Sequence, residues 1–214
     1  MTFVAVVFDC DGVLVDSEWA SAEAWKSALA RYGWELSAQE FVRFIGTTDR
    51  ELASVFASRL DTTPEEVLAV AEAEMRKVLA AGLELFGDAW RLAERSKGYL
   101  LAVASNSERW RLDCVLESAG LGGLFAVSVA SDEVARPKPS PDVYLRTAAM
   151  LGVEAEGCLV IEDSPTGIAA ARAAGMTVVA VDRGNFQSQQ LAMANEVVSS
   201  LDEFQWPSAM HYPT

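Results

Sequence analysis

The chain has 214 residues, enough to bury a sizeable core in one large or two small domains. Its formal net charge of −14 argues against partners such as nucleic acid or an anionic membrane, because binding either requires a basic surface. The three dispersed cysteines favour a reducing compartment, and the N-terminus lacks the basic region of a secretory signal, so we expect a cytoplasmic protein.

The chain begins with a predicted strand at residues 3–8, whose uninterrupted apolar run is typical of a central strand in a parallel sheet. Asp9 and Asp11 follow at once, at the carboxyl end where open α/β sheets bind ligands. Two adjacent carboxylates repel each other unless a cation lies between them, and Mg²⁺ prefers such oxygen ligands. Asp and Gly are also ordinary turn residues, so this segment taken alone is more often a simple loop after a strand.

Residues 17–82 show helical spacing of apolar side chains throughout and contain no strand-like run. The pattern predicts roughly four helices directly after the first strand. We therefore expect a helical domain over residues 17–82, inserted into a core that consists of residues 1–16 and 83–214.

From residue 83 onward, strand and helix patterns alternate, which indicates an α/β fold with a Rossmann-like parallel sheet and crossover helices. The predicted strands are 99–104, 125–130, 158–161 and 176–181, and the predicted helices are 108–119, 142–151 and 166–174.

Three further polar segments end strands or lie just beyond them, at the same predicted edge of the sheet. The first contains Ser105 and Asn106, which alone would suit a helix cap. The second contains Lys138, which two flanking prolines hold in a stiff, extended loop. The third contains Glu162 and Asp163, which either bind a metal ion or cap the next helix.

A single histidine, His211, lies close to the C-terminal end. The sequence therefore offers no positioned imidazole for a Ser-His-Asp or Cys-His catalytic unit. Acid–base chemistry is expected to fall to carboxylates or lysine.

The four polar segments, in this order on successive strand ends, resemble the motifs of the haloacid dehalogenase (HAD) superfamily. The resemblance covers nearly the whole chain and is strongest to the subfamily of β-phosphoglucomutase and sugar-phosphate phosphatases, through Asp16-Ser17-Glu18 and Lys138-Pro139-x-Pro141-Asp142. It implies that Asp9 is the nucleophile and that Asp11 is the general acid and base. Further implied roles are Mg²⁺ binding by Asp9, Asp11, Asp163 and Glu162, and phosphoryl binding by Ser105, Asn106 and Lys138.

The same resemblance implies that the helical domain is a mobile cap over the core. Residues 46–50 resemble its substrate-specificity loop, so Thr47 and Arg50 are candidate substrate-binding residues. For Arg50, a surface ion pair on a helix remains an equal alternative.

The resemblance leads us to expect a Mg²⁺-dependent phosphatase that acts on a small phosphorylated metabolite, a sugar phosphate or a sugar-acid phosphate, as a monomer or weak homodimer. The alternative is a phosphosugar mutase. The mutase relatives carry a histidine where this chain has Ser21 and a cap lysine near Ala71, and this chain has neither. A phospho-accepting receiver module is an alternative of another class, but it needs about half this length and no helical cap.

Overall fold

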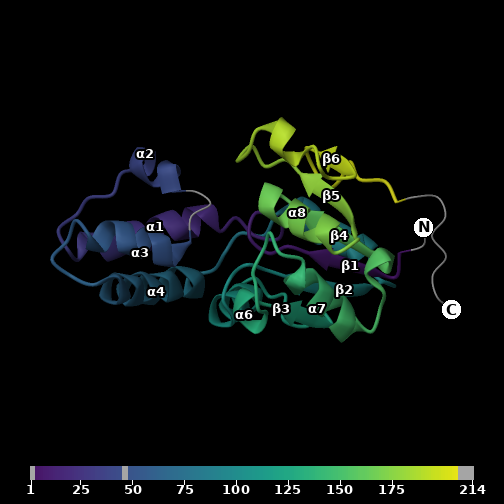
Figure 1. The fold of residues 1–214 in the computed structure, drawn as a ribbon, viewed down its shortest axis with the longest axis horizontal. Helices are drawn as coiled ribbons and strands as arrows, with labels where there is room; N and C mark the ends of the chain where they lie inside the picture. The colour runs from purple at the N-terminus through teal and green to yellow at the C-terminus, as the bar shows by residue number, and fades with distance from the viewer. Residues whose placement is uncertain (1–2, 45–47, 207–214) are drawn as a thin grey trace. The chain divides into compact units, whose positions relative to one another are not determined.

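The computed structural model describes residues 3–44 and 48–206, and the chain divides into two compact units (Figure 1). The core unit joins Met1–Asp16 to Glu84–Thr214, and the helical unit is Ser17–Leu83. Within the described ranges, no helix is both long and apolar enough to cross a membrane.

Within the described part of the core unit, six parallel strands form one sheet. The strands are β1 (Ala5–Phe8), β2 (Leu100–Ala104), β3 (Val127–Val129), β4 (Cys158–Glu162), β5 (Thr177–Val181) and β6 (Glu196–Val198). Their order is β3-β2-β1-β4-β5-β6, so the chain reverses its direction of growth across the sheet at β1. Such a reversal opens a crevice at the carboxyl ends of the strands, which is where ligands bind in open α/β sheets.

Helices connect these strands, as the alternating pattern predicted, and the expected α/β fold with a parallel sheet is confirmed. The helices are α5 (Gly87–Arg95), α6 (Arg109–Ser118), α7 (Asp142–Leu151) and α8 (Pro165–Ala173), with short 3-10 helices at Ser131–Glu133, Ala155–Gly157 and Ser188–Leu191. The sequence pattern missed α5 and β6. Strand β6 has only three residues and two of them are exposed, so it lacks the apolar run that marks the other strands.

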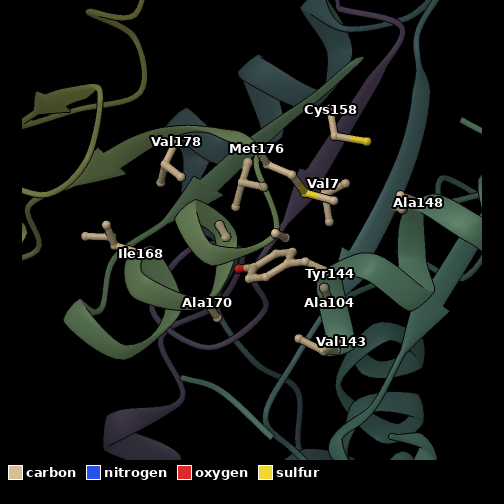
Figure 2. Close-up of a cluster of buried hydrophobic side chains, with 14 of the residues drawn as sticks. Val7, Ala104, Val143, Tyr144, Ala148, Cys158, Ile168, Ala170, Met176 and Val178 are labelled. Carbon is tan, nitrogen blue, oxygen red and sulfur yellow. The ribbon is translucent and has the colours of Figure 1, made fainter. Parts of the chain in front are cut away.

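Helices α7 and α8 pack on one face of the sheet, where the side chains are mostly small or β-branched (Figure 2). The ring of Tyr144 lies among these side chains and is fully buried. Side chains that alternate to the opposite face, such as Phe8 and Val103, are fully buried as well. Because the side chains on both faces of the sheet are buried, the carboxyl edge is left to carry polar residues.

Within its described residues, the helical unit contains four α-helices and one short 3-10 helix. They are α1 (Glu18–Ala30), α2 (Ala38–Phe41), α3 (Asp49–Ala57) and α4 (Pro64–Ala80), with the 3-10 helix at Val42–Phe44. Capping boxes at Thr48 and Thr63 begin α3 and α4. The fully buried Phe56 contacts the rings of Trp25, Trp34 and Phe44, which gives this unit an aromatic core of its own.

Candidate active site

The carboxyl edge of the sheet brings together residues that lie far apart in the sequence. Asp9 directly follows β1, Ser105 directly follows β2, and Glu162 ends β4 with Asp163 next to it. Because β1 lies between β2 and β4, all of these residues meet around the end of the central strand. The fifth predicted residue, Lys138, reaches the same place from the loop before α7.

The ammonium group of Lys138 lies at the centre of the site and is almost fully buried. It donates hydrogen bonds to Asp9 Oδ1 at 2.5 Å, Glu162 Oε1 at 2.7 Å and the carbonyl oxygen of Ala104 at 3.0 Å. Its Nζ also lies 4.8 Å from the centre of the Tyr144 ring. All three protons of the ammonium group are therefore directed, and the side chain has one defined position.

Both carboxylate oxygens of Glu162 are already occupied by protein donors. Oε1 accepts from Lys138 and from the hydroxyl of Tyr144 at 2.8 Å. Oε2 accepts from the backbone N–H groups of Asp163 and Ser164 and from the Ser164 hydroxyl, each at 3.0 Å. This arrangement suits Glu162 to holding Lys138 in place, rather than to binding a metal ion directly.

The pKa values of the three buried carboxyl groups are shifted in different directions: that of Glu162 is lowered, and those of Asp9 and Asp163 are raised. Burial opposes the ionisation of Glu162, but Lys138 outweighs it and holds the pKa of Glu162 below its ordinary value. Burial raises the pKa of Asp9 to about 8, because the nearby carboxylates of Glu162 and Asp11 add to the effect and Lys138 only partly offsets it. Burial and the charges of Glu162 and Asp9 raise the pKa of Asp163 to about 9.

The donor set fits a hard divalent cation. Carboxylate oxygens of Asp9, Glu162 and Asp163 all lie within 4.8 Å of one another. Asp9 and Asp163 have raised pKa values because burial disfavours their ionisation and because the site holds more negative groups than Lys138 neutralises. A divalent cation would supply the missing positive charge, and the carboxylate oxygens of Asp9 and Asp163 are the ligand type that Mg²⁺ prefers.

Asp11 lies beside this cluster, and its carboxylate is held by the segment that follows β2. Asp11 Oδ2 accepts hydrogen bonds from the Ser107 hydroxyl at 2.8 Å and from the Ser105 hydroxyl at 3.4 Å. Arg111 Nη2, on α6, lies 3.6 Å from Asp11 Oδ1. The Asp11 side chain as a whole is partly exposed, whereas its Oδ1 atom is buried.

The remaining predicted site residues have different placements. The Asn106 side chain accepts from Lys138 N at 2.8 Å and donates to the Lys138 carbonyl oxygen at 3.3 Å. These bonds suit Asn106 to holding the Lys138 loop. Arg50 is exposed on α3 of the helical unit, and Thr47 lies outside the described residues.

Sequence reasoning did not identify three residues that touch this cluster, namely Ser107, Arg111 and Tyr144. Ser107 stands two residues after Ser105, so its position after the strand was an available signal. Arg111 and Tyr144 lie within helical patterns, where nothing in the sequence marks one side chain as facing the site.

The turn after β1 requires glycine at position 12, which gives a testable prediction. Gly12 has φ +80°, and an added Cβ would lie 2.1 Å from Asp163 Oδ2. We expect Gly12→Ala to lower the free energy of unfolding in urea by at least about 1 kcal/mol more than Gly152→Ala. Gly152 is a matched control because it has φ +71° with open space around it, so alanine there costs only the backbone strain of roughly 1–2 kcal/mol. Equal losses would contradict the close packing of Gly12 against Asp163.

Comparison with known proteins shows similarity over most of the chain. A family model for haloacid dehalogenase-like hydrolases matches residues 6–181. The bifunctional riboflavin kinase/FMN phosphatase of Arabidopsis thaliana is 32% identical over 205 residues, which are 92% of this chain and 53% of that protein. The chain thus spans about half the length of that relative.

Other similar proteins match over almost their whole length. The fructose-1-phosphate phosphatase YqaB of Escherichia coli (strain K12) is 30% identical over 185 residues, which are 84% of this chain and 96% of that protein. The crystal structure of CbbY from Rhodobacter sphaeroides in complex with phosphate superposes with a TM-score of 0.84 at 25% identity, covering 94% of this chain and 96% of that one.

Proposed function

The chain belongs to the haloacid dehalogenase-like hydrolase family, and on that basis we propose that it is a phosphatase that hydrolyses a small phosphomonoester through an aspartyl-phosphate formed on Asp9. The observation that carries the proposal is the convergence of Asp9, Lys138 and Asp163 at the end of β1, with the Asp11 carboxylate beside them. This set provides a nucleophile, a fixed positive charge, a cation site and a proton donor.

In the proposed reaction, a carboxylate oxygen of Asp9 attacks phosphorus and the bond from phosphorus to the ester oxygen breaks. Asp11 gives its proton to the departing oxygen, then takes a proton from the water that attacks the aspartyl-phosphate. That second attack releases inorganic phosphate and restores Asp9. Lys138 and Ser105 offset the negative charge of the transferring phosphoryl group.

Mg²⁺ is the proposed cofactor, with Asp9 and Asp163 as side-chain ligands, the backbone carbonyl of Asp11 as a further ligand implied by the family, and Glu162 as a supporting carboxylate. When bound, the ion supplies positive charge that lets the phosphoryl group approach the carboxylates.

The proposed substrate is a sugar phosphate or sugar-acid phosphate, and the likeness to a fructose-1-phosphate phosphatase supports this class. We further propose that the helical unit acts as a cap that excludes water and contacts the part of the substrate that does not react, with Thr47 and Arg50 as candidate contacts. The cytoplasmic location and the monomer or weak homodimer stay predictions.

The proposal is tested by phosphate release from a panel of sugar phosphates and other phosphomonoesters, with Mg²⁺ and with EDTA. We expect release that EDTA abolishes and that Mg²⁺ restores. The Mg²⁺ concentration for half-maximal rate should fall as pH rises toward about 8 to 9, because Asp9 and Asp163 must lose their protons to bind a cation.

The same panel decides between hydrolysis and the mutase alternative. Conversion of β-glucose 1-phosphate to glucose 6-phosphate without release of phosphate would favour the mutase. The receiver alternative is disfavoured by the family match, which spans residues 6–181.

A further inference from the structure

A second polar cluster in the core unit contacts the turn that follows β1. Its centre is Arg183, which comes two residues after β5 and therefore at the same edge of the sheet as the site residues. Arg183 forms a two-bond ion pair with Asp88, the second residue of α5, with Nη1 to Oδ2 and Nη2 to Oδ1 both at 2.9 Å. The two residues are 95 positions apart in the sequence.

The same guanidinium group also reaches the backbone of the turn. Its Nε donates to the carbonyl oxygen of Gly12 at 3.2 Å, and its Nη2 is 3.4 Å from the carbonyl oxygen of Val13. Its Cζ lies 4.0 Å from the centre of the Phe86 ring, and the backbone N–H of Phe86 donates to the carbonyl oxygen of Leu14 at 2.9 Å. Arg183 thus links three consecutive residues of the turn, directly or through Phe86, to other parts of the core unit.

Asp88 in turn is held by several donors. Its Oδ2 accepts from the backbone N–H of Leu201 at 2.9 Å and from the Ser200 hydroxyl at 3.2 Å, and its Oδ1 accepts from Ala89 N at 2.8 Å. Burial opposes its ionisation, but the bonds from Arg183 and Leu201 outweigh this and lower the pKa of Asp88 to about 2. The carboxylate is therefore charged at neutral pH, and its two bonds to Arg183 hold the guanidinium group in one orientation.

We propose that Arg183 is a positioning residue for the reaction. By binding the carbonyl groups of Gly12 and Val13, Arg183 fixes the turn that begins directly after Asp11. The fixed turn keeps the Asp11 carboxylate where it can protonate the departing oxygen. This inference rests on the proposed phosphatase function. It goes beyond that function because neither Arg183 nor Asp88 belongs to the four polar segments that carry the family resemblance.

Arg91, which pairs with Asp202, is a control of the same pairing geometry at a more exposed place, since its side chain is 57% exposed against 13% for Arg183. Arg91 donates to the Asp202 carboxylate through Nε at 2.9 Å and Nη2 at 2.6 Å. Both arginines thus pair with a carboxylate in two-bond geometry, and both pairs link α5 to another segment of the core unit: Asp88 of α5 to Arg183 after β5, and Arg91 of α5 to Asp202. Among the described residues, the side-chain hydrogen bonds to the carbonyl groups of Gly12 and Val13 come from Arg183, so Arg91→Met removes an ion pair of α5 without removing a bond to the turn.

The first measurement is amide hydrogen exchange in the turn, which needs no enzymatic activity. Three amides report on it, since Gly12 N donates to Val15 O and both Leu14 N and Val15 N donate to Cys10 O. We expect Arg183→Met to speed exchange at these amides by at least about 10-fold, and Arg91→Met to leave it unchanged. Unchanged exchange in Arg183→Met, or an equal increase in both variants, would overturn the proposal.

The second measurement compares kcat/KM for phenyl phosphate and p-nitrophenyl phosphate in the presence of Mg²⁺. Phenolate is the poorer leaving group and depends more on a proton donor. We expect Arg183→Met to lower kcat/KM for phenyl phosphate by about 10-fold to 100-fold, and for p-nitrophenyl phosphate by less than about 3-fold. Equal losses for both esters would reduce Arg183 to a structural role.

Arg183→Lys is a second test variant, to be used if Arg183→Met does not fold. Lysine keeps the charge but has only three N–H donors on one atom, so it cannot keep both bonds to Asp88 together with both carbonyl bonds, and the same selective loss is expected at smaller amplitude. If the wild-type protein released no phosphate from either ester, the proposed function would fail and the catalytic part of this inference with it. Hydrogen exchange would then still confirm or refute that Arg183 holds the turn.

Discussion

Replacing Asp9 by Asn is expected to lower kcat at least about 10³-fold while the protein stays folded. The asparagine amide has nearly the same size but is not a nucleophile for phosphorus, so no aspartyl-phosphate forms. Lys138 keeps its bonds to Glu162 and to the carbonyl oxygen of Ala104, so the centre of the site keeps its main contacts. Phosphate release and circular dichroism measure the two expectations, and retained turnover would remove Asp9 as the nucleophile.

The same variant has a stability signature that depends on pH. Because the pKa of Asp9 is about 8 in the folded protein and about 4 in an unfolded chain, ionisation of Asp9 increasingly disfavours the folded state as pH rises from 4 to 8. Asparagine never ionises. In EDTA, the melting temperature of Asp9→Asn relative to wild type should therefore rise across this interval.

The control for this pH trend is Asp113→Asn. Asp113 is an exposed carboxylate on α6 that pairs with Arg109, so its replacement repeats the change from Asp to Asn outside the buried cluster. A flat difference for Asp9→Asn would contradict the electrostatic strain that we assign to the buried carboxyl cluster.

Replacing Lys138 by Met is expected to cause the largest loss of stability of the substitutions considered. The change removes the positive charge that faces Glu162, whose side chain is fully buried. Removing one partner of a buried ion pair costs about 3–5 kcal/mol, because the other charge is left without compensation. The free energy of unfolding in urea measures this loss, and kcat should also fall by about 10²-fold to 10³-fold as the phosphoryl group loses its cation.

The loss should depend on pH in a defined direction. Without Lys138, burial should place the folded-state pKa of Glu162 above its unfolded value, so protonation relieves the unpaired charge at low pH. Lys138→Met should therefore be less destabilised at pH 5 than at pH 8. The double variant Lys138→Met with Glu162→Gln should be more stable than Lys138→Met alone, and the absence of such recovery would contradict the ion pair as the cause.

Lys97→Met is the matched control for Lys138→Met. Lys97 Nζ pairs with Glu94 Oε2 at 2.6 Å, but both side chains are exposed and the two residues are only three positions apart in the sequence. Such a pair contributes little to stability, so this variant should change the free energy of unfolding by less than about 1 kcal/mol. The contrast would show that burial, and not the presence of an ion pair, decides the effect.

The sequence alone was sufficient for the alternation of strands and helices and for the polar residues that end the strands. These properties are local, since a buried parallel strand is an apolar run and the residue after it must lie at the carboxyl edge. Helix α7, for example, has the predicted bounds of 142–151. Local patterns failed for α5, which begins with a glycine and has many charged residues, and for the short exposed strand β6.

The sequence also placed Asp9, Asp11, Ser105, Lys138 and Glu162 at one edge, but it could not say which of them touch. Lys138 contacts Asp9 across 129 positions of sequence and Glu162 across 24. Only the strand order, with β1 between β2 and β4, brings these groups within hydrogen-bonding distance. The tertiary structure likewise showed that the Glu162 oxygens are occupied and that Asn106 faces the backbone of Lys138.

Arg183 illustrates the division most clearly. Its position two residues after β5 could be foreseen from the sequence, because residues that follow a parallel strand lie at the carboxyl edge. Its partners could not be foreseen, because Asp88 and the carbonyl group of Gly12 come from segments 95 and 171 positions away. Sequence patterns determine which face or edge a residue occupies, whereas contacts between distant segments depend on how the whole chain packs, and the tertiary structure alone decided them.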